Sequence, residues 1–327
     1  MQSKRLFQIS RPGLKICKYR NVKSWVAKAI TEEELKPNTQ LWRKEPTQEF
    51  QYNERLRRIK FLRKHLKSDP SLQIIIDRLE RCKTDNRCFA GACPECGRLL
   101  QRWFVRKSKK LIRDEIENPD QQLVAISIIP STPIVRPGKL RGFSISNMQR
   151  RLKYALDKIG LAIAIGAFDF SFNEDRDGKY QPFLCIHPYL VTSISNKTRI
   201  KRLLKQIFKP DGRIPRPIKI SDFNNCAWRR SYAFKIRFEC RIGHNALKQE
   251  SDGNIRRCRD TSRGKLRSSE RLELFKYLDQ IGFHQRFIFC GIKPITKGGK
   301  VVIRKTQAFE CRIKPNPKKL QKMPKNR

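Results

Sequence analysis

Four cysteines fall within one short stretch, and this cluster constrains the fold more than any other part of the sequence. Residues 82–97 read CKTDNRCFAGACPECG, which gives the spacing C-x5-C-x4-C-x2-C through Cys82, Cys88, Cys93 and Cys96. Tetrahedral zinc takes four thiolates about 2.3 Å from the metal, and a C-x2-C turn supplies two of them. The cluster therefore predicts a closed, structural zinc site that ties its flanking segments together.

The spacing leaves two alternatives to a four-cysteine site. The separation between Cys82 and Cys88 is long, so without Cys82 the other three cysteines would need a ligand from elsewhere in the chain. The four could also be unrelated, with two of them buried in a core. Disulfides are not expected, because the first residues, MQSKRLFQISRPGLK, contain no apolar segment of signal-peptide length and predict a cytoplasmic, reducing location.

The charge of the chain indicates its class of partner. The sequence has 74 lysines and arginines against 30 aspartates and glutamates, a formal net charge of +44. A protein this basic repels itself unless a polyanion neutralises it, and nucleic acid is the commonest such partner. A membrane is not expected as a partner, because no apolar run reaches the roughly 18 residues of a membrane span. The sequence does not specify an oligomeric state.

Helical periodicity dominates the chain from residue 48 to residue 118. The spacing of apolar residues predicts helices over 48–65, 71–81 and 97–117, with the cysteine cluster between the last two. The preceding arm, 1–47, has few periodic apolar positions and is predicted to be irregular. We therefore expect a helical, zinc-binding segment, 48–118, in front of a separate core.

From residue 123 the pattern becomes one of alternating strands and helices. The expected elements are strand 123–130, helix 146–160, strand 161–173, strand 181–193, helix 198–208 and strand 216–223. This β-α-β-β-α-β order is the split βαβ, or ferredoxin-like, arrangement. The sequence thus predicts an α+β fold with an antiparallel sheet in a core at 123–240.

The C-terminal third is predicted to form a helical and basic extension, 241–314. Within it, residues 251–267 are rich in arginine and lysine and are predicted to be a loop, whereas 269–282 has the caps and spacing of a helix. The last residues, 315–327, are basic and contain proline, which predicts a disordered tail.

The strand QPFLCIHPYLVTS, 181–193, carries one of only four histidines in the chain. Because strand side chains alternate, Cys185 and His187 share a face, and Asp169 on the preceding strand could lie beside them. These three residues are the candidate ligands of a divalent ion such as Mg²⁺ or Mn²⁺. A lone histidine also suits an ordinary core position, and the aromatic stretch FDFSF around Asp169 could instead stack unpaired bases.

A helix predicted over 224–236 would carry Tyr232 and Lys235 on one face, at i and i+3. A tyrosine among basic residues can act as the nucleophile on a phosphodiester, with the lysine stabilising the phosphate. Tyr232 could equally be a core or surface aromatic residue. The basic residues expected to contact nucleic acid are Arg229, Arg230, Arg237, Arg256, Arg257, Lys265 and Arg267.

Four motifs occur in the order found in one family of DNA-processing proteins. They are CPEC (93–96), VAISIIP (124–130), QPFLCIHPYLV (181–191) and YAFK (232–235). In this respect the chain resembles rolling-circle replication initiators (Rep) of the HUH endonuclease superfamily, whose core is a split βαβ sheet. The resemblance implies that Tyr232 nicks DNA and becomes linked to a 5′ phosphate, with Lys235 stabilising the phosphate and Asp169 acting as an acidic metal ligand. The family has two histidines on its metal-binding strand. Aligned on the QP dipeptide this chain has Phe183 and Cys185 at those positions, and aligned on its histidine it has Cys185 and His187.

The sequence thus favours a DNA-binding, replication-initiation-like protein of a plasmid, phage or other mobile element, and leaves open whether it still nicks single-stranded DNA. The alternative is a non-catalytic, zinc-containing protein that binds DNA or RNA, for example a ribosome-associated factor in which Tyr232 is structural.

Overall fold

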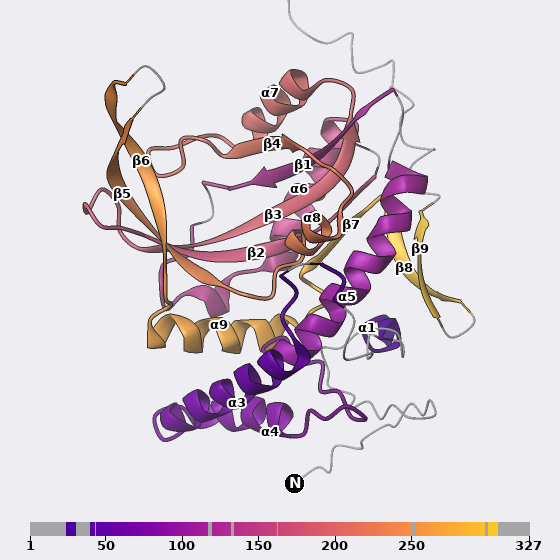
Figure 1. Ribbon diagram of the computed structural model, residues 1–327, viewed down its shortest axis with the longest axis vertical. Coiled ribbons are helices and arrows are strands. Elements are labelled where there is room, and N and C mark those ends of the chain that lie inside the picture. The colour runs from indigo at the N-terminus through magenta and orange to yellow at the C-terminus, as the bar shows by residue number, and fades with distance from the viewer. Residues whose placement is uncertain are drawn as a thin grey trace, which may run out of the picture.

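The computed structural model describes residues 24–30, 40–42, 44–116, 120–131, 134–161, 163–249, 253–297 and 300–306. Part of the predicted irregular arm is a short helix, α1 (Ser24–Ala29), which packs its Val26 and Ala27 into the core. The predicted tail, 315–327, lies outside the described residues. Within the described ranges the chain is a mixture of helices and strands around one large sheet, as the sequence predicted (Figure 1).

A curled sheet forms the centre of the molecule (Figure 1). Its strands run in the order β4-β1-β3-β2-β5-β6, and β7 pairs with β2 beside β5. Most neighbours are antiparallel, and β5 lies parallel to β2. The strands are β1 (Gln122–Ile128), β2 (Ala164–Asp175), β3 (Phe183–Ile194), β4 (Ile218–Asp222), β5 (Glu239–Gln249), β6 (Ile255–Gly264) and β7 (Phe287–Cys290).

Three helices cover one face of the sheet: α6 (Ile145–Lys158), α7 (Lys197–Ile207) and α9 (Ser268–Ile281). Because α6 follows β1 and α7 follows β3, the chain from β1 to β4 has the strand-helix-strand-strand-helix-strand order expected from the sequence. The rings of Phe168 and Phe170 are 1% exposed, that of Phe172 is 2% exposed, and all three pack under these helices. The alternative in which FDFSF stacks unpaired bases is therefore wrong, because its aromatic side chains are core residues.

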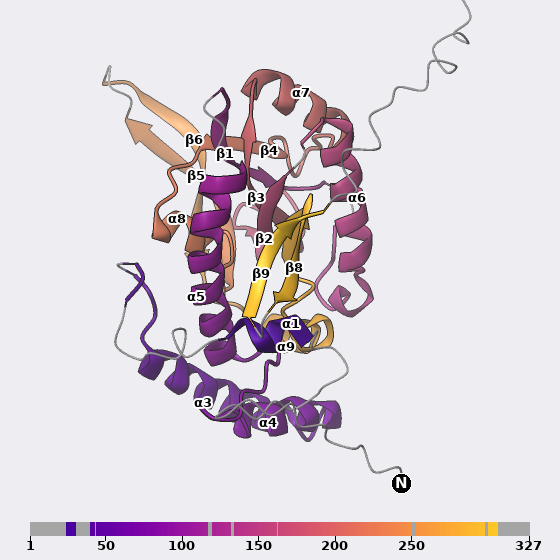
Figure 2. The same cartoon turned by 90° about the vertical axis from the view of Figure 1, so that its right-hand side faces the viewer.

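The opposite face meets a long helix, α5 (Pro94–Leu111), which continues as a π-helical turn, η2 (Ile112–Ile116). Figure 2 shows α5 on one side of the sheet and α6 on the other. Trp103 and Phe104 of α5 pack with Phe287 of β7 at ring-centroid distances of 5.7 and 5.8 Å. A short helix, α8 (Ala227–Tyr232), lies against the same helix.

The N-terminal helices form a layer at the end of the sheet, below α9 in Figure 1. They are α3 (Gln48–His65), which Thr47 caps, a 3-10 turn, η1 (Pro70–Leu72), and α4 (Gln73–Glu80). Ion pairs join them to α9: Arg78 Nη1 lies 2.6 Å from Asp279 Oδ2, and Lys276 Nζ lies 2.5 Å from Asp69 Oδ2. Among the described residues, no helix is both long enough and apolar enough to cross a bilayer.

The structure corrects two expectations about the C-terminal half. Residues 251–267 were expected to form a loop, but β6 pairs along its whole length with β5 in a long hairpin that projects from the sheet (Figure 1). The helix expected over 224–236 ends at Tyr232. Beyond it Phe234 and Ile236 are buried while Arg237 is exposed, and this alternation suits an extended chain better than a helix.

Three small elements complete the description. A 3-10 turn, η3 (Leu140–Gly142), precedes α6, and its Leu140 N donates to Glu273 of α9. A separate two-stranded sheet pairs β8 (Ile292–Lys297) with β9 (Lys300–Lys305) and packs near α1 and α5.

Candidate functional site

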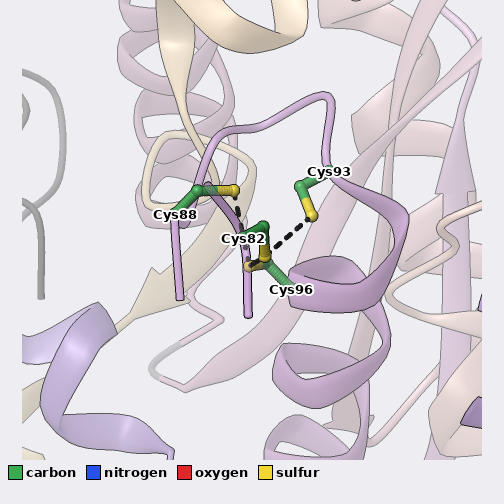
Figure 3. Close-up of side chains that lie close together, drawn as sticks. All are labelled: Cys82, Cys88, Cys93 and Cys96. Atoms are coloured by element: carbon green, nitrogen blue, oxygen red, sulfur yellow. Dashed lines mark hydrogen bonds between the residues drawn. The ribbon is translucent and has the colours of Figure 1, made fainter. Parts of the chain in front are cut away.

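The four cysteines converge on one buried point. Cys82 follows α4, Cys88 lies in the next loop, Cys93 is the N-cap of α5, and Cys96 is in its first turn. The Cys82 sulfur lies 3.6 Å from those of Cys93 and Cys96, and Cys88 and Cys96 are 3.8 Å apart (Figure 3). A tetrahedron of sulfurs about 2.3 Å from a central ion has edges of about 3.8 Å. All four side chains, Cys82 included, therefore fit a single metal ion.

The surroundings of the cysteines hold them in this arrangement. Glu95, between the last two cysteines, pairs with Arg55 of α3 at 2.5 Å and with Arg87 at 2.6 Å. Phe89 N donates to the Cys96 sulfur at 3.3 Å, and Phe89 itself has a φ of 47°, a strained value for an aromatic residue. Four buried thiols gathered at one point suit a structural metal, and soft thiolates suit zinc.

A second group of polar side chains lies on the sheet face that α6 and α7 do not cover. Asp169 of β2 and His187 of β3 are direct partners in the strand register. His187 Nε2 lies 3.4 Å from Asp169 Oδ2, and Lys235 Nζ lies 2.6 Å from the same oxygen. Cys185 is the next residue on this face, with its sulfur 3.9 Å from His187 Nδ1. The structure thus brings together the three predicted strand residues and Lys235.

Burial and the Lys235 ion pair set the charges in this group. Burial would raise the pKa of the Asp169 carboxyl, but the charges of His187 and Lys235 outweigh it, so this pKa lies below its usual value. Burial lowers the pKa of His187 to about 4, with the Asp169 carboxylate opposing the shift. Burial would also lower the pKa of Lys235, but Asp169 and then Tyr232 raise it above its ordinary value. At neutral pH the group is an aspartate–ammonium pair beside a neutral histidine.

Tyr232 lies at the edge of this group and is partly open to solvent. Lys235 Nζ is 4.1 Å from the centroid of its ring, and the ring of Tyr189 on β3 packs against it at 5.2 Å. Tyr232 is 37% exposed, so it is not a core aromatic residue. The two residues predicted to share a helix face do lie together, although Lys235 reaches Tyr232 from the extended chain after the helix.

The strand residues do not fit a Mg²⁺ or Mn²⁺ ion. The Asp169 carboxylate is paired with an ammonium group, and burial raises the pKa of the Cys185 thiol to about 12, which leaves it neutral. Magnesium and manganese prefer carboxylate and other oxygen ligands. Among the described residues, a convergent group of three or more cysteine, histidine or acidic ligands is found at the four cysteines and not here. We therefore derive no step through a divalent ion.

One of the seven basic residues predicted to contact nucleic acid is buried, and the other six are half-buried or exposed. Arg230 is 5% exposed and donates to Val105 O and Asn225 Oδ1, so the prediction for this residue is wrong, because its guanidinium is used inside the fold. Arg267 precedes α9 and pairs with Glu174. Arg237 is exposed and stacks over Phe50. The other predicted residues are half-buried or exposed and lie on α8 and on or after the β5–β6 hairpin: Arg229, Arg256, Arg257 and Lys265.

Two arginines of the site were not predicted. Arg286 is 1% exposed, its guanidinium donates to the carbonyl of Lys235, and the rings of Phe234 and Phe238 lie 4.6 and 5.1 Å from it. It holds the extended segment that carries Lys235. Arg241 of β5 pairs in register with Asn173, on the same sheet face as Asp169. No local pattern in the sequence marks either residue. Both reach the site only because segments far apart in the chain lie together in the fold.

Comparison with known proteins reveals no relative of this chain. It matches no protein-family model, and searches of curated proteins and of solved structures give no match either.

Proposed function

We propose that this protein binds DNA and breaks and joins one strand of it through Tyr232, in the manner of a rolling-circle replication initiator. In this proposal the strands β1 to β4 with α6 and α7 are the split βαβ, ferredoxin-like core of an HUH-type nuclease. The four-cysteine cluster holds a structural zinc ion. The chain's net charge of +44 supports a polyanionic substrate.

The observation that carries the proposal is the row of contacting side chains from Tyr232 to His187. A half-open tyrosine touches a lysine, the lysine pairs with a buried aspartate, and the aspartate faces a histidine. Asp169 fixes the Lys235 ammonium beside the phenol, where it can neutralise a phosphate brought to Tyr232. The ion pair also satisfies the buried Asp169 carboxylate, so the support for a role of the tyrosine is the contact of the Lys235 ammonium with its half-exposed ring.

The reaction is a transesterification that needs neither an oxidant nor a nucleotide cofactor. The Tyr232 oxygen attacks the phosphorus of a phosphodiester, an O–P bond to tyrosine forms, and the bond from phosphorus to the 3′ oxygen breaks. The phenol gives its proton to solvent and the 3′ oxygen gains one, so no net charge is created. Lys235 stabilises the charge on the phosphate as the bonds exchange.

A second candidate is a protein that binds nucleic acid without cutting it. The observation that favours it is the state of the strand residues: His187 is neutral, Cys185 is protonated, and Asp169 is occupied by Lys235. These residues are not poised to hold the divalent ion that the family resemblance implies. In this case the sheet face would serve as a binding platform for DNA or RNA.

The test is the formation of a covalent protein–DNA adduct. The full chain is incubated with supercoiled plasmid and with a single-stranded DNA pool of random sequence, in Mg²⁺, in Mn²⁺ and in chelator. We expect an adduct that survives denaturation, that is lost in Tyr232→Phe and that falls at least about tenfold in Lys235→Gln. Tyr154→Phe, an exposed tyrosine on α6, is the matched control. Binding without an adduct under every condition would select the non-catalytic candidate.

A further inference from the structure

A small pocket opens on the sheet face next to the Asp169–His187 pair and is not used by the chemistry above. It has a volume of about 210 Å³, and its floor includes Ser171, Asn173, Cys185 and His187. Sites for whole small molecules usually enclose roughly 300–1,000 Å³. This pocket is therefore large enough for one flat ring or one phosphate, and too small for a complete nucleotide cofactor.

The walls of the pocket are aromatic and apolar. Tyr180, in the turn between β2 and β3, and Phe183, at the start of β3, line it with their rings packed edge to face at 5.4 Å. Ile214 and Pro215 line it from the segment before β4. Ring walls above a floor of hydroxyl and amide groups are the surroundings that an unpaired base finds in single-strand binding proteins.

Three arginines also line the pocket: Arg213, Arg216 and Arg241. Arg213 Nη2 forms an ion pair with Asp211 Oδ2 at 3.1 Å. Arg213 and Arg216 are both exposed, so they form the solvent-facing rim of the pocket. Arg241 is half-buried, and its charge acts on His187, Asp169 and Cys185 inside the site. The rim thus carries an excess of positive charge, as expected where phosphates flank a bound base.

We infer that this pocket receives one unpaired base of a single-stranded DNA, with the flanking phosphates on Arg213, Arg216 and Arg241. The inference deepens the proposed function, because it takes nucleic acid as the ligand of this face. The inference also places the bound base relative to the phosphate that Tyr232 attacks. His187 and Tyr189 are two residues apart on β3, roughly 7 Å, and Tyr189 packs against Tyr232. The bound base therefore lies one or two nucleotides from the phosphate at Tyr232, where it can select the sequence at the cleavage point.

The experiment measures equilibrium binding, in the full chain carrying Tyr232→Phe so that no covalent step interferes. Fluorescence anisotropy gives the Kd for labelled oligo-dT, for oligo-dA and for an abasic strand of equal length. We expect Tyr180→Ala to weaken the base-bearing strands about five- to hundredfold, the effect of losing one stacked base, and to leave the abasic strand unchanged. Tyr180→Phe keeps the ring and should bind as the parent does.

The rim is tested by charge removal. Arg216→Gln should weaken all three strands and reduce the slope of log Kd against log salt by about 0.7. The matched control is Arg199→Gln, an exposed arginine on α7 at the covered face of the sheet, which should leave the slope unchanged.

Two outcomes would overturn the inference: equal affinity of the parent for oligo-dT and the abasic strand, or an equal loss for both in Tyr180→Ala. Thermal unfolding of each variant shows whether it has folded, and the parent's affinity for oligo-dT against the abasic strand still decides if the alanine variant has not. The result is separable from the adduct assay. An adduct with no base dependence at the pocket would refute the pocket alone, whereas base-dependent binding without an adduct would refute the tyrosine chemistry alone.

Discussion

The Lys235 ammonium group neutralises the buried carboxylate of the site. It pairs with the buried Asp169 carboxylate at 2.6 Å, while its other neighbour is the ring of Tyr232. A buried carboxylate without a partner would cost several kcal/mol or take up a proton. One side chain thus meets a structural need of the sheet and places a positive charge beside the tyrosine.

The neutral His187 gives the protein an acid-sensitive stability. Its pKa is about 4 in the folded protein and about 6.5 in an unfolded chain, so the unfolded chain binds more protons between these values. The free energy of unfolding should therefore decrease as pH falls from about 6.5 towards 4. The loss from this residue is about 2 kcal/mol by about pH 5. The lowered pKa of Asp169 adds a further loss at lower pH.

Urea unfolding of the wild type and of His187→Gln, at about pH 7 and at about pH 5, measures this contribution. The variant should lose about 2 kcal/mol less than the wild type between the two values. His65→Gln, a change of a half-buried histidine on α3, is the control for the loss of an imidazole elsewhere in the fold. Parallel pH profiles for all three proteins would show that folding does not lower the pKa of His187.

At the scale of elements, the cysteine loop joins three parts of the fold. It connects the end of α4 to the start of α5, and its Gly91 lies so close to α9 that an added Cβ would stand 1.9 Å from the Leu278 carbonyl oxygen. A metal ion at the cysteines would therefore fix the N-terminal helices, the long helix α5 and α9 together.

Removal of the metal should destabilise this junction. We expect one zinc ion per chain by elemental analysis. Chelation or Cys88→Ser should lower the Tm by more than about 10 °C, because binding energy at a structural zinc site is folding energy. Cys258→Ser, a half-buried cysteine on β6, should keep both the metal and the Tm. A metal-free wild type with an unchanged Tm would mean that the four thiols pack without an ion.

How far the sequence predicts each element depends on whether its pattern is local. The cysteine spacing and the strand-helix-strand-strand-helix-strand order are local, and both appear in the structure. The β5–β6 hairpin was missed because both its faces are largely polar, so no alternation of apolar residues marks it. Lys235 was placed correctly beside Tyr232 but on the wrong element, because burial of Phe234 and Ile236 overrides the helical pattern there. Arg286 was beyond prediction, since only the folded chain brings it under Lys235.

At the scale of the whole molecule, the pairing of β5 with β2 and with β6 makes the β5–β6 hairpin continuous with the candidate site. Arg241 pairs with Asn173 of β2 and with Arg263 of β6, and Leu247 pairs with Arg257 further along the hairpin. Because paired residues share a face, Arg257 and Arg263 continue the surface that carries Asp169. Like charges directly opposite each other destabilise a sheet, and Arg263 Nε lies 3.4 Å from Glu239 Oε2, which offsets part of this repulsion. This arrangement suits a nucleic-acid strand that runs from the hairpin towards Tyr232.

The salt dependence of single-stranded DNA binding tests this path. Each phosphate contact that is lost reduces the slope of log Kd against log salt by about 0.7. The double variant Arg257→Gln/Arg263→Gln should therefore reduce it by about 1.4, while Arg199→Gln/Arg202→Gln on α7 makes the same change of charge on the covered side and should leave it nearly unchanged. If both pairs reduce the slope equally, the DNA samples the basic surface without a preferred path, and the hairpin has no special part in binding. A loss confined to the hairpin pair would mean that the strand reaches the tyrosine along one face of the sheet.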